Sequence, residues 1–340
     1  MAKKSNDERI FPLYAYPTLF FFFAIWFLVG GEVFFRFAEP LDKFPAILEA
    51  DQTLSYKLKD KATGQFVSGD GEVDVAMSVN ARGLRDGVIL HQKPWNTTRI
   101  LALGGASTFG WGLPLEETFP KLLEKQLSNQ SDEKRQNFEV INGGVPGYTL
   151  SQSLKFYETE LNKYSPDWVV LFLDADLSYD SINLHTIKKG VIQERPVPLY
   201  EVPFYCSMLQ EVSSLIAFAC ERENRFFPAE RDDDTDFNYS ARAKALEVAL
   251  LQKLAQDCAE KGSKLLIVVP DNVSRSLESL AKVADTIAFP TVSTAKSYAK
   301  TGYLNREETN DVTKKLFFFF DEIYSLKNVG LPTKTPASMK

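Results

Sequence analysis

The residues with the most chemical potential lie at the ends of three short apolar segments. Residues 104–110 read Gly-Gly-Ala-Ser-Thr-Phe-Gly, 142–147 read Asn-Gly-Gly-Val-Pro-Gly, and 174–176 read Asp-Ala-Asp. Backbone N–H groups in glycine-rich turns can hold an anion or an oxyanion, and a serine hydroxyl beside a base can act as a nucleophile. Each turn alone is also typical of an ordinary strand-to-helix connection. The candidate ligand-binding residues are Gly104, Gly105, Ser107, Gly144, Asp174 and Asp176.

Side chains that activate nucleophiles or bind metals are scarce. The chain has only two histidines, His91 and His185, although histidine is the commonest base in nucleophilic catalysis. The three cysteines, Cys206, Cys220 and Cys258, lack zinc-site spacing. We expect no metal and no cofactor. Two alternatives stay open for the first two cysteines, a disulfide or buried thiols.

The elements that must position these residues follow a strand–helix alternation. Continuous apolar runs at 99–103, 138–141, 168–173 and 264–269 are typical of strands buried on both faces. Helices are predicted after Thr118, over 241–261, and from Asn305, whose spacing to Glu308 fits a capping box, to about 326. The pattern predicts a three-layer, flavodoxin-like α/β domain, with a parallel sheet covered by helices on both faces.

An uncharged segment precedes this domain. Residues 10–31 carry no charge, and a helix that crosses a bilayer needs about 20 apolar residues. We therefore predict a cytoplasmic tip and transmembrane anchor over 1–37, with residues 10–35 in contact with the membrane. The excess of basic residues before the segment favours a cytoplasmic N-terminus and an outer-facing main domain. The alternatives are a cleavable signal peptide and a buried core helix.

The rest of the chain divides by composition. Residues 38–95 are predicted to form an irregular, β-leaning leader, 96–327 the α/β domain with a helical insertion at about 178–239, and 328–340 a disordered tail. The net charge of −6 argues against a nucleic-acid partner, because phosphate binding needs clustered positive charge.

Four segments together resemble one family of enzymes. The segment 99–112, with Glu-Glu-Thr-Phe-Pro at 116–120, resembles the first block of SGNH (GDSL-like) hydrolases, and 142–148 resembles the second. Residues 166–176 resemble the third block and 302–305 the last. Asn-Ala-Arg-Gly-Leu-Arg at 80–85 resembles a segment that precedes the first block in the membrane-anchored bacterial branch associated with envelope polysaccharides. The resemblance covers about residues 75–325 and implies an SGNH-hydrolase-type fold.

The family's reacting groups are largely replaced at the matching positions. The resemblance puts a nucleophilic serine where this chain has Ala106, and an oxyanion asparagine where it has Ala175. An Asp and a His three residues apart would stand at Lys300 and Tyr303, while the oxyanion glycine is kept as Gly144. An active enzyme would therefore need replacements for both nucleophile and base.

Three functions are compatible with this pattern. The main hypothesis is a membrane-tethered, periplasmic or extracellular pseudoenzyme at the inner membrane. It would bind a glycan or acyl ligand, or an envelope protein partner, during polysaccharide assembly or modification. The second is an active esterase or O-acyltransferase with displaced catalytic residues, namely Ser107, His185 and Asp176. The third is a structural subunit of a membrane complex, which the aromatic anchor and Phe317–Phe320 would fit.

Overall fold

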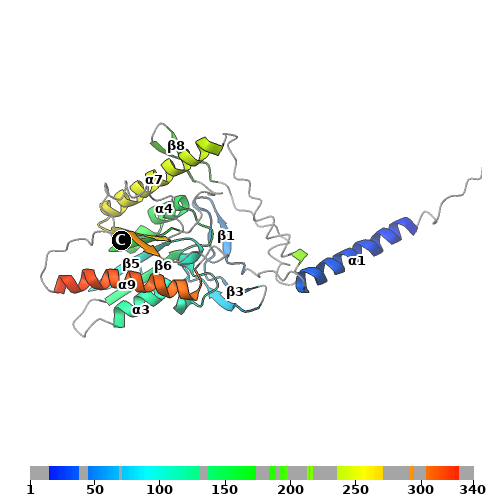
Figure 1. Cartoon of the computed structure of the whole chain (residues 1–340), viewed down its shortest axis with the longest axis horizontal. Coiled ribbons are helices and arrows are strands. Elements are labelled where there is room, and N and C mark those ends of the chain that lie inside the picture. The colour runs from blue at the N-terminus through cyan, green and yellow to red at the C-terminus, as the bar shows by residue number, and fades with distance from the viewer. Residues whose placement is uncertain are drawn as a thin grey trace, which may run out of the picture. The chain divides into compact units, whose positions relative to one another are not determined.

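A computed structural model describes residues 15–37, 45–68, 71–129, 137–173, 184–188, 191–197, 213, 215–216, 236–270, 291–294 and 304–328. The chain divides into two compact units. One contains the helix α1 (Ala15–Phe37), and the other contains the α/β domain. Figure 1 shows the elements of each unit.

The first unit is organised around α1. Residues Ala15–Phe35 have a mean hydropathy of 2.0 and none of this stretch is buried, so the helix is long and apolar enough to cross a membrane. The predicted apolar helix is therefore confirmed as an element. Near its end, the Glu32 carboxylate accepts hydrogen bonds from the Ser213 hydroxyl (2.8 Å) and the Leu215 N–H (3.1 Å). A short part of the predicted insertion thus contacts this helix.

The second unit is built on a five-stranded parallel sheet in the order β11-β10-β7-β5-β6. The four predicted strands are present; they are β5 (Thr97–Gly104), β6 (Asn137–Gly144), β7 (Trp168–Phe172) and β10 (Lys264–Pro270). The edge strand β11 (Thr291–Thr294) was not predicted, because four residues rich in threonine give no apolar run. All five residues of β7 are buried, as expected for a central strand covered on both faces.

Helices cover the two faces of this sheet (Figure 1). One layer consists of α3 (Phe119–Asn129) and α9 (Arg306–Asn328), and the other of α4 (Leu150–Thr159) and α7 (Asp236–Glu260). The rings of Phe319 and Phe320 pack edge-on against Trp168 from the first layer. The predicted α/β fold is therefore confirmed, and two of the four consecutive phenylalanines of α9 belong to its core.

The helix ends agree with the sequence at one predicted cap and differ at another. Asn305 and Glu308 form the predicted reciprocal cap, with N–H to side-chain distances of 2.9 and 3.0 Å. Thr118 does not cap α3 with its side chain. Its hydroxyl donates instead to the Leu115 carbonyl (2.8 Å) in the 3-10 turn Leu115–Glu117.

The segment before β5 is more regular than predicted. Strands β1 (Leu48–Asp51) and β2 (Ser55–Leu58) form one antiparallel pair, and β3 (Thr63–Val67) and β4 (Asp74–Ser78) form another. Another antiparallel pair, β8 (His185–Lys188) and β9 (Val191–Glu194), lies in the segment predicted as a helical insertion. Cys206, Cys220 and the tail 329–340 lie outside the described residues.

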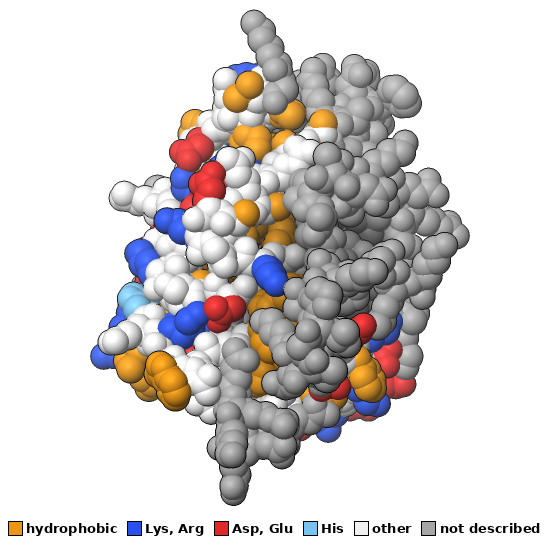
Figure 2. All heavy atoms as spheres, turned by 90° about the vertical axis from the view of Figure 1, so that its left-hand side faces the viewer, with side chains coloured by type: hydrophobic (Ala, Val, Ile, Leu, Met, Phe, Trp, Pro, Cys, Tyr) orange, Lys and Arg blue, Asp and Glu red, His pale blue; other side chains and the backbone are white. Residues whose placement is uncertain are grey.

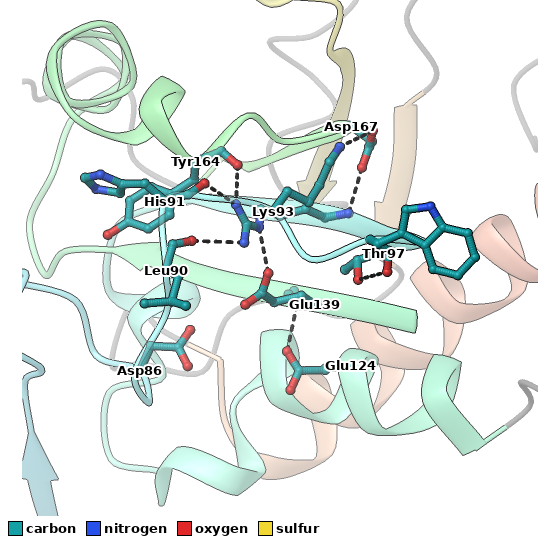
Figure 3. Close-up of polar contacts among 12 residues, drawn as sticks. Asp86, Leu90, His91, Lys93, Thr97, Glu124, Glu139, Tyr164 and Asp167 are labelled. Carbon is teal, nitrogen blue, oxygen red and sulfur yellow. Dashed lines mark hydrogen bonds and ion pairs between the residues drawn. The ribbon is translucent and has the colours of Figure 1, made fainter. Parts of the chain in front are cut away.

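A buried arginine joins the amino end of β5 to the surrounding loops, and Figure 3 labels the residues that accept its hydrogen bonds. The Arg99 side chain is fully buried, and its Nε donates to the Glu139 carboxylate at 2.6 Å. Its Nη atoms donate to the carbonyls of Leu90, His91 and Tyr164. Loss of Arg99 would leave each of these acceptors without its donor. The hydrogen bonds of Arg99 therefore hold in place the start of β5, the strand that leads to the first block.

Candidate functional site

Strands β5 and β6 bring the first two blocks together at the carboxyl edge of the sheet. Their register pairs Gly104 with Gly144, the last residue of each strand, which is where open parallel α/β sheets bind ligands. Gly104 has a φ of +150°, and a Cβ there would lie 2.4 Å from the Thr108 Oγ1 and 2.8 Å from the Phe172 carbonyl oxygen. Both the backbone angle and the space therefore require glycine at this turn.

The short helix α2 (Ala106–Phe109) turns the first block into a compact loop. Ala106, at the family's nucleophile position, is partly exposed, whereas every other residue of 101–110 is buried. Ser107 is only 3% exposed, and its hydroxyl has no hydrogen-bond partner among the described residues. The hydroxyl thus lies one residue away from the accessible position, and the accessible position carries a methyl group.

Gly144, the matching oxyanion residue, has its N–H engaged within the protein. It donates to the Asn142 Oδ1 at 3.0 Å. A Cβ at Gly144 would lie 2.2 Å from the Phe109 backbone nitrogen. The close approach of β6 to α2 is therefore sufficient to explain this glycine, independently of any bound oxyanion.

Arg85, at the end of the 80–85 segment, holds the same loop from the leader side. The buried guanidinium donates to the carbonyls of Phe109 (2.9 Å), Gly110 (2.6 Å) and Leu113. It also lies 4.7 Å from the centre of the Phe109 ring. Burial lowers the pKa of Arg85 to about 10, so the group stays charged at neutral pH. The sequence drew attention to this segment only through its resemblance, and gave no sign that Arg85 binds the first block.

Asp86 makes the corresponding contact with the second block. Its carboxylate accepts from the Asn142 N–H at 2.9 Å and pairs with the Lys121 ammonium of α3 at 2.6 Å. Burial raises the pKa of Asp86, although Lys121 and the N–H groups of Asn142 and Gly87 oppose this rise. Arg85 and Asp86 together tie the leader to both glycine-rich turns.

The β-leaning leader packs onto the same edge. The Tyr148 hydroxyl donates to the Tyr56 carbonyl at 2.7 Å, and the Tyr56 hydroxyl donates to the Pro146 carbonyl at 3.0 Å. On the first block, the Trp111 ring lies 5.3 Å from the ring of Phe66. The leader therefore contacts both of the first two blocks.

Neither histidine is hydrogen-bonded to Ser107. His185 is 2% exposed and its Nδ1 lies 2.6 Å from the hydroxyl of Ser151. His91 contacts Arg82 and the ring of Tyr164, and its carbonyl accepts from Arg99 near the start of β5. The strand β5 separates that position from Ala106, which follows the strand's other end.

Several predicted site residues lie outside the described part of the chain. They are Asp174, Ala175, Asp176, Lys300 and Tyr303. The roles assigned to them remain predictions. Within the described residues, the predicted ligand-binding glycines and Ser107 do gather at one edge, as the sheet register requires.

The surface charges show no preference for one sign on the face in Figure 2. Lysine, arginine, aspartate and glutamate side chains are interspersed over its described part. A nucleic-acid surface would instead need basic side chains in a continuous patch.

Comparison with known proteins gives a likeness to esterases. No protein-family model matches the chain. An arylesterase of Vibrio mimicus is 32% identical over 78 residues, which are 23% of this chain and 37% of that protein. The chain thus matches only about a third of the length of this relative.

Solved structures with a similar arrangement include several esterases. The psychrotrophic esterase EstA of Pseudoalteromonas sp. is 16% identical, with a TM-score of 0.39, over 68% of this chain and 99% of that one. A Desulfitobacterium hafniense protein assigned to the G-D-S-L family of lipolytic proteins is 10% identical, with a TM-score of 0.37, over 64% and 99%. A two-domain esterase active on acetylated mannans is 14% identical, with a TM-score of 0.40, over 72% and 53%. The chain is thus similar to an arylesterase over a short segment and to GDSL-type esterases among solved structures.

Proposed function

We propose that this chain is a membrane-tethered SGNH-like pseudoenzyme, which binds a ligand or partner at the carboxyl edge of its sheet without catalysing ester transfer. The observation that carries the proposal is the placement of the first block. Ala106 occupies the partly exposed position, and the neighbouring Ser107 hydroxyl is buried without a hydrogen-bonded base. Serine attack on an ester needs both access to the carbonyl and a base that removes the proton.

The scarcity of imidazole supports the same conclusion. Both histidines of the chain are accounted for, His185 against Ser151 and His91 near the start of β5. The loop that carries Ala106 is nevertheless held in place by Arg85 and by the contacts of Asn142. The glycine-rich turns at this edge of the sheet are kept in place, whereas the nucleophile and the base are absent, and this combination favours ligand binding over catalysis.

The tether and the location of the domain complete the proposal. We infer that α1 anchors the chain in the inner membrane with its N-terminus in the cytoplasm, because basic residues precede the apolar segment. The domain then faces the periplasm or the outside. A glycan or acyl group of the envelope polysaccharides is the ligand class that this location and the resemblance favour.

The first test concerns catalysis. Full-length protein in detergent micelles should hydrolyse p-nitrophenyl acetate no faster than the buffer, and a fluorophosphonate serine probe should not label it. Ala106→Ser, which restores a hydroxyl at the partly exposed position, should remain as inactive, because no histidine is hydrogen-bonded at this loop. Activity would be followed by absorbance and labelling by mass spectrometry.

Ser107→Ala is the matched control for this test. Turnover by the unmodified protein that disappears in Ser107→Ala, or labelling at Ser107 itself, would show an active site with displaced residues and would refute the pseudoenzyme. Substantial turnover by Ala106→Ser alone would show that a base is present and that the site lacks only its nucleophile.

The second test concerns topology. An alkaline phosphatase fused after residue 340 should be active in cells, because this enzyme folds only after export, and the protein should stay with the membrane fraction after a carbonate wash. A fusion after residue 9 serves as the control and should be inactive. An inactive C-terminal fusion would overturn the proposed orientation, and release by carbonate would overturn the anchor.

A further inference from the structure

The chain's buried histidine, His185, makes its side-chain hydrogen bond with a residue that belongs to neither glycine-rich turn. His185 begins strand β8, which packs against α7, and its ring contacts a serine of α4. The side chain is 2% exposed, and its Nδ1 lies 2.6 Å from the hydroxyl of Ser151, which is fully buried in the first turn of α4. This contact joins the β8–β9 hairpin to the helix that follows the second block.

The two strands of the hairpin pack against α7 and are mostly half-buried or exposed. Its register pairs His185 with Glu194, and of the residues in the two strands only His185 is buried. Glu194 forms an ion pair with Lys155 of α4 at 2.6 Å, on a carboxylate that is largely exposed. An exposed ion pair contributes little free energy, whereas the hydrogen bond of His185 with Ser151 is buried.

We propose that Ser151 and His185 form a proton-sensitive latch, which holds the β8–β9 hairpin against α4 and α7 at neutral pH and releases it in acid. A neutral imidazole fits this buried site, with one nitrogen satisfied by the serine hydroxyl. The hydroxyl can also accept from a protonated ring, so the hydrogen bond itself does not oppose protonation. The opposing factor is burial of the positive charge, which the ring avoids when the hairpin opens to water.

The neighbouring charges act in both directions. Glu194, across the hairpin, favours a protonated ring, whereas Lys155 of α4 and Lys253 of α7 oppose it. Lys253 is itself paired with Glu158 of α4 and with Asp257 of α7. Burial is the largest influence and lowers the pKa of His185, so the folded hairpin binds fewer protons than the open one.

The sign and size of the effect follow from this difference. The imidazole of His185 binds a proton more readily in the open form than in the closed form, so acid favours opening. The closed form therefore keeps its full stability only above the ordinary histidine pKa of about 6.5. Between pH 8 and pH 5 the open population should rise by up to about 30-fold, the ratio expected for one such group.

Hydrogen exchange of the full-length protein in detergent micelles tests the latch. After correction for the intrinsic pH dependence of exchange, the protection of peptides covering 184–197 should fall by about 10- to 30-fold from pH 8 to pH 5. Peptides of β5 serve as the internal reference and should keep their protection. His185→Gln should remove most of this fall, and any remainder reports other groups, such as Glu194, whose pKa is lowered by its contact with Lys155.

Two further variants separate the latch from general effects. His91→Gln removes the only other histidine and should leave the fall unchanged. Ser151→Ala should lower hairpin protection already at pH 8, because it leaves a buried ring nitrogen unpaired. The proposal would be overturned if the hairpin lost no more protection between pH 8 and pH 5 in the wild type than in His185→Gln. It would also be overturned if the hairpin of Ser151→Ala were as protected at pH 8 as that of the wild type.

A wild-type measurement keeps the proposal testable if His185→Gln does not fold. The two histidine signals can be followed by NMR in protein labelled at histidine. His91 should titrate independently of the hairpin, whereas the His185 signal should change only where hairpin protection is lost. Titration of His185 near pH 6.5 with the hairpin still protected would overturn the latch.

Discussion

Replacing Arg85 by methionine is expected to lower the free energy of unfolding of the domain by about 3–5 kcal/mol, because three buried carbonyls each lose a hydrogen bond worth about 1–3 kcal/mol. Arg85 is 1% exposed, and its loss leaves the carbonyls of Phe109, Gly110 and Leu113 without this donor. Methionine fills part of the space but donates no hydrogen bond. For a domain of this size the melting temperature should fall by at least about 6 °C.

Arg82→Met is the matched control, because it makes the same change three residues earlier. Arg82 is exposed and contacts the imidazole of His91, so its replacement should change the unfolding free energy by no more than about 0.5 kcal/mol. Both variants would be compared by thermal unfolding in the same detergent. Equal stability of the two variants would show that Arg85 does not hold the first block.

Limited proteolysis locates the effect of Arg85→Met. Because the guanidinium contacts carbonyls only within 109–113, cleavage near this loop should appear before the sheet unfolds. Cleavage confined to the leader would instead indicate that Arg85 stabilises the 80–85 segment and not the site.

The parallel sheet could be predicted because its strands carry a strong local signal. Central strands buried on both faces are continuous apolar runs, and β5, β6, β7 and β10 all read this way. Edge and surface strands carry no such signal. β11 reads Thr-Val-Ser-Thr, and the strands of the β8–β9 hairpin have a single buried residue, so neither was predicted.

The location of the candidate site could be predicted from the sequence, but the contacts of its residues could not. Strand ends and glycine spacing put Gly104 and Gly144 side by side. Ala106 is partly exposed and Ser107 is buried because of the way the four-residue helix α2 faces solvent. The sequence of so short a helix does not show which of two neighbouring residues is exposed. Contacts such as that of Arg85 with Phe109 join residues 24 positions apart, and no local pattern encodes them.

The second large effect is expected at Gly144. The sequence suggested an oxyanion donor at this position, whereas the structure gives the glycine a steric role. A Cβ would lie 2.2 Å from the Phe109 nitrogen, 2.6 Å from the Thr108 carbonyl carbon and 2.8 Å from the Phe109 Cα. All three are backbone atoms, which cannot rotate out of the way as a flexible side chain could.

Gly144→Ala should therefore destabilise the domain by about 3 kcal/mol or more, at or above the upper end of the usual cost of overpacking. Gly87→Ala is the matched control. Gly87 lies close in space to the same network through Asp86, has no left-handed φ, and has nothing within 4 Å of the added methyl group. That variant should be unchanged or more stable by about 0.4–1 kcal/mol, through the loss of unfolded-state entropy. Thermal and denaturant unfolding of both proteins measure the difference. If Gly144→Ala is as stable as Gly87→Ala, packing does not explain the glycine, and a role for its N–H in ligand or oxyanion binding becomes the better account.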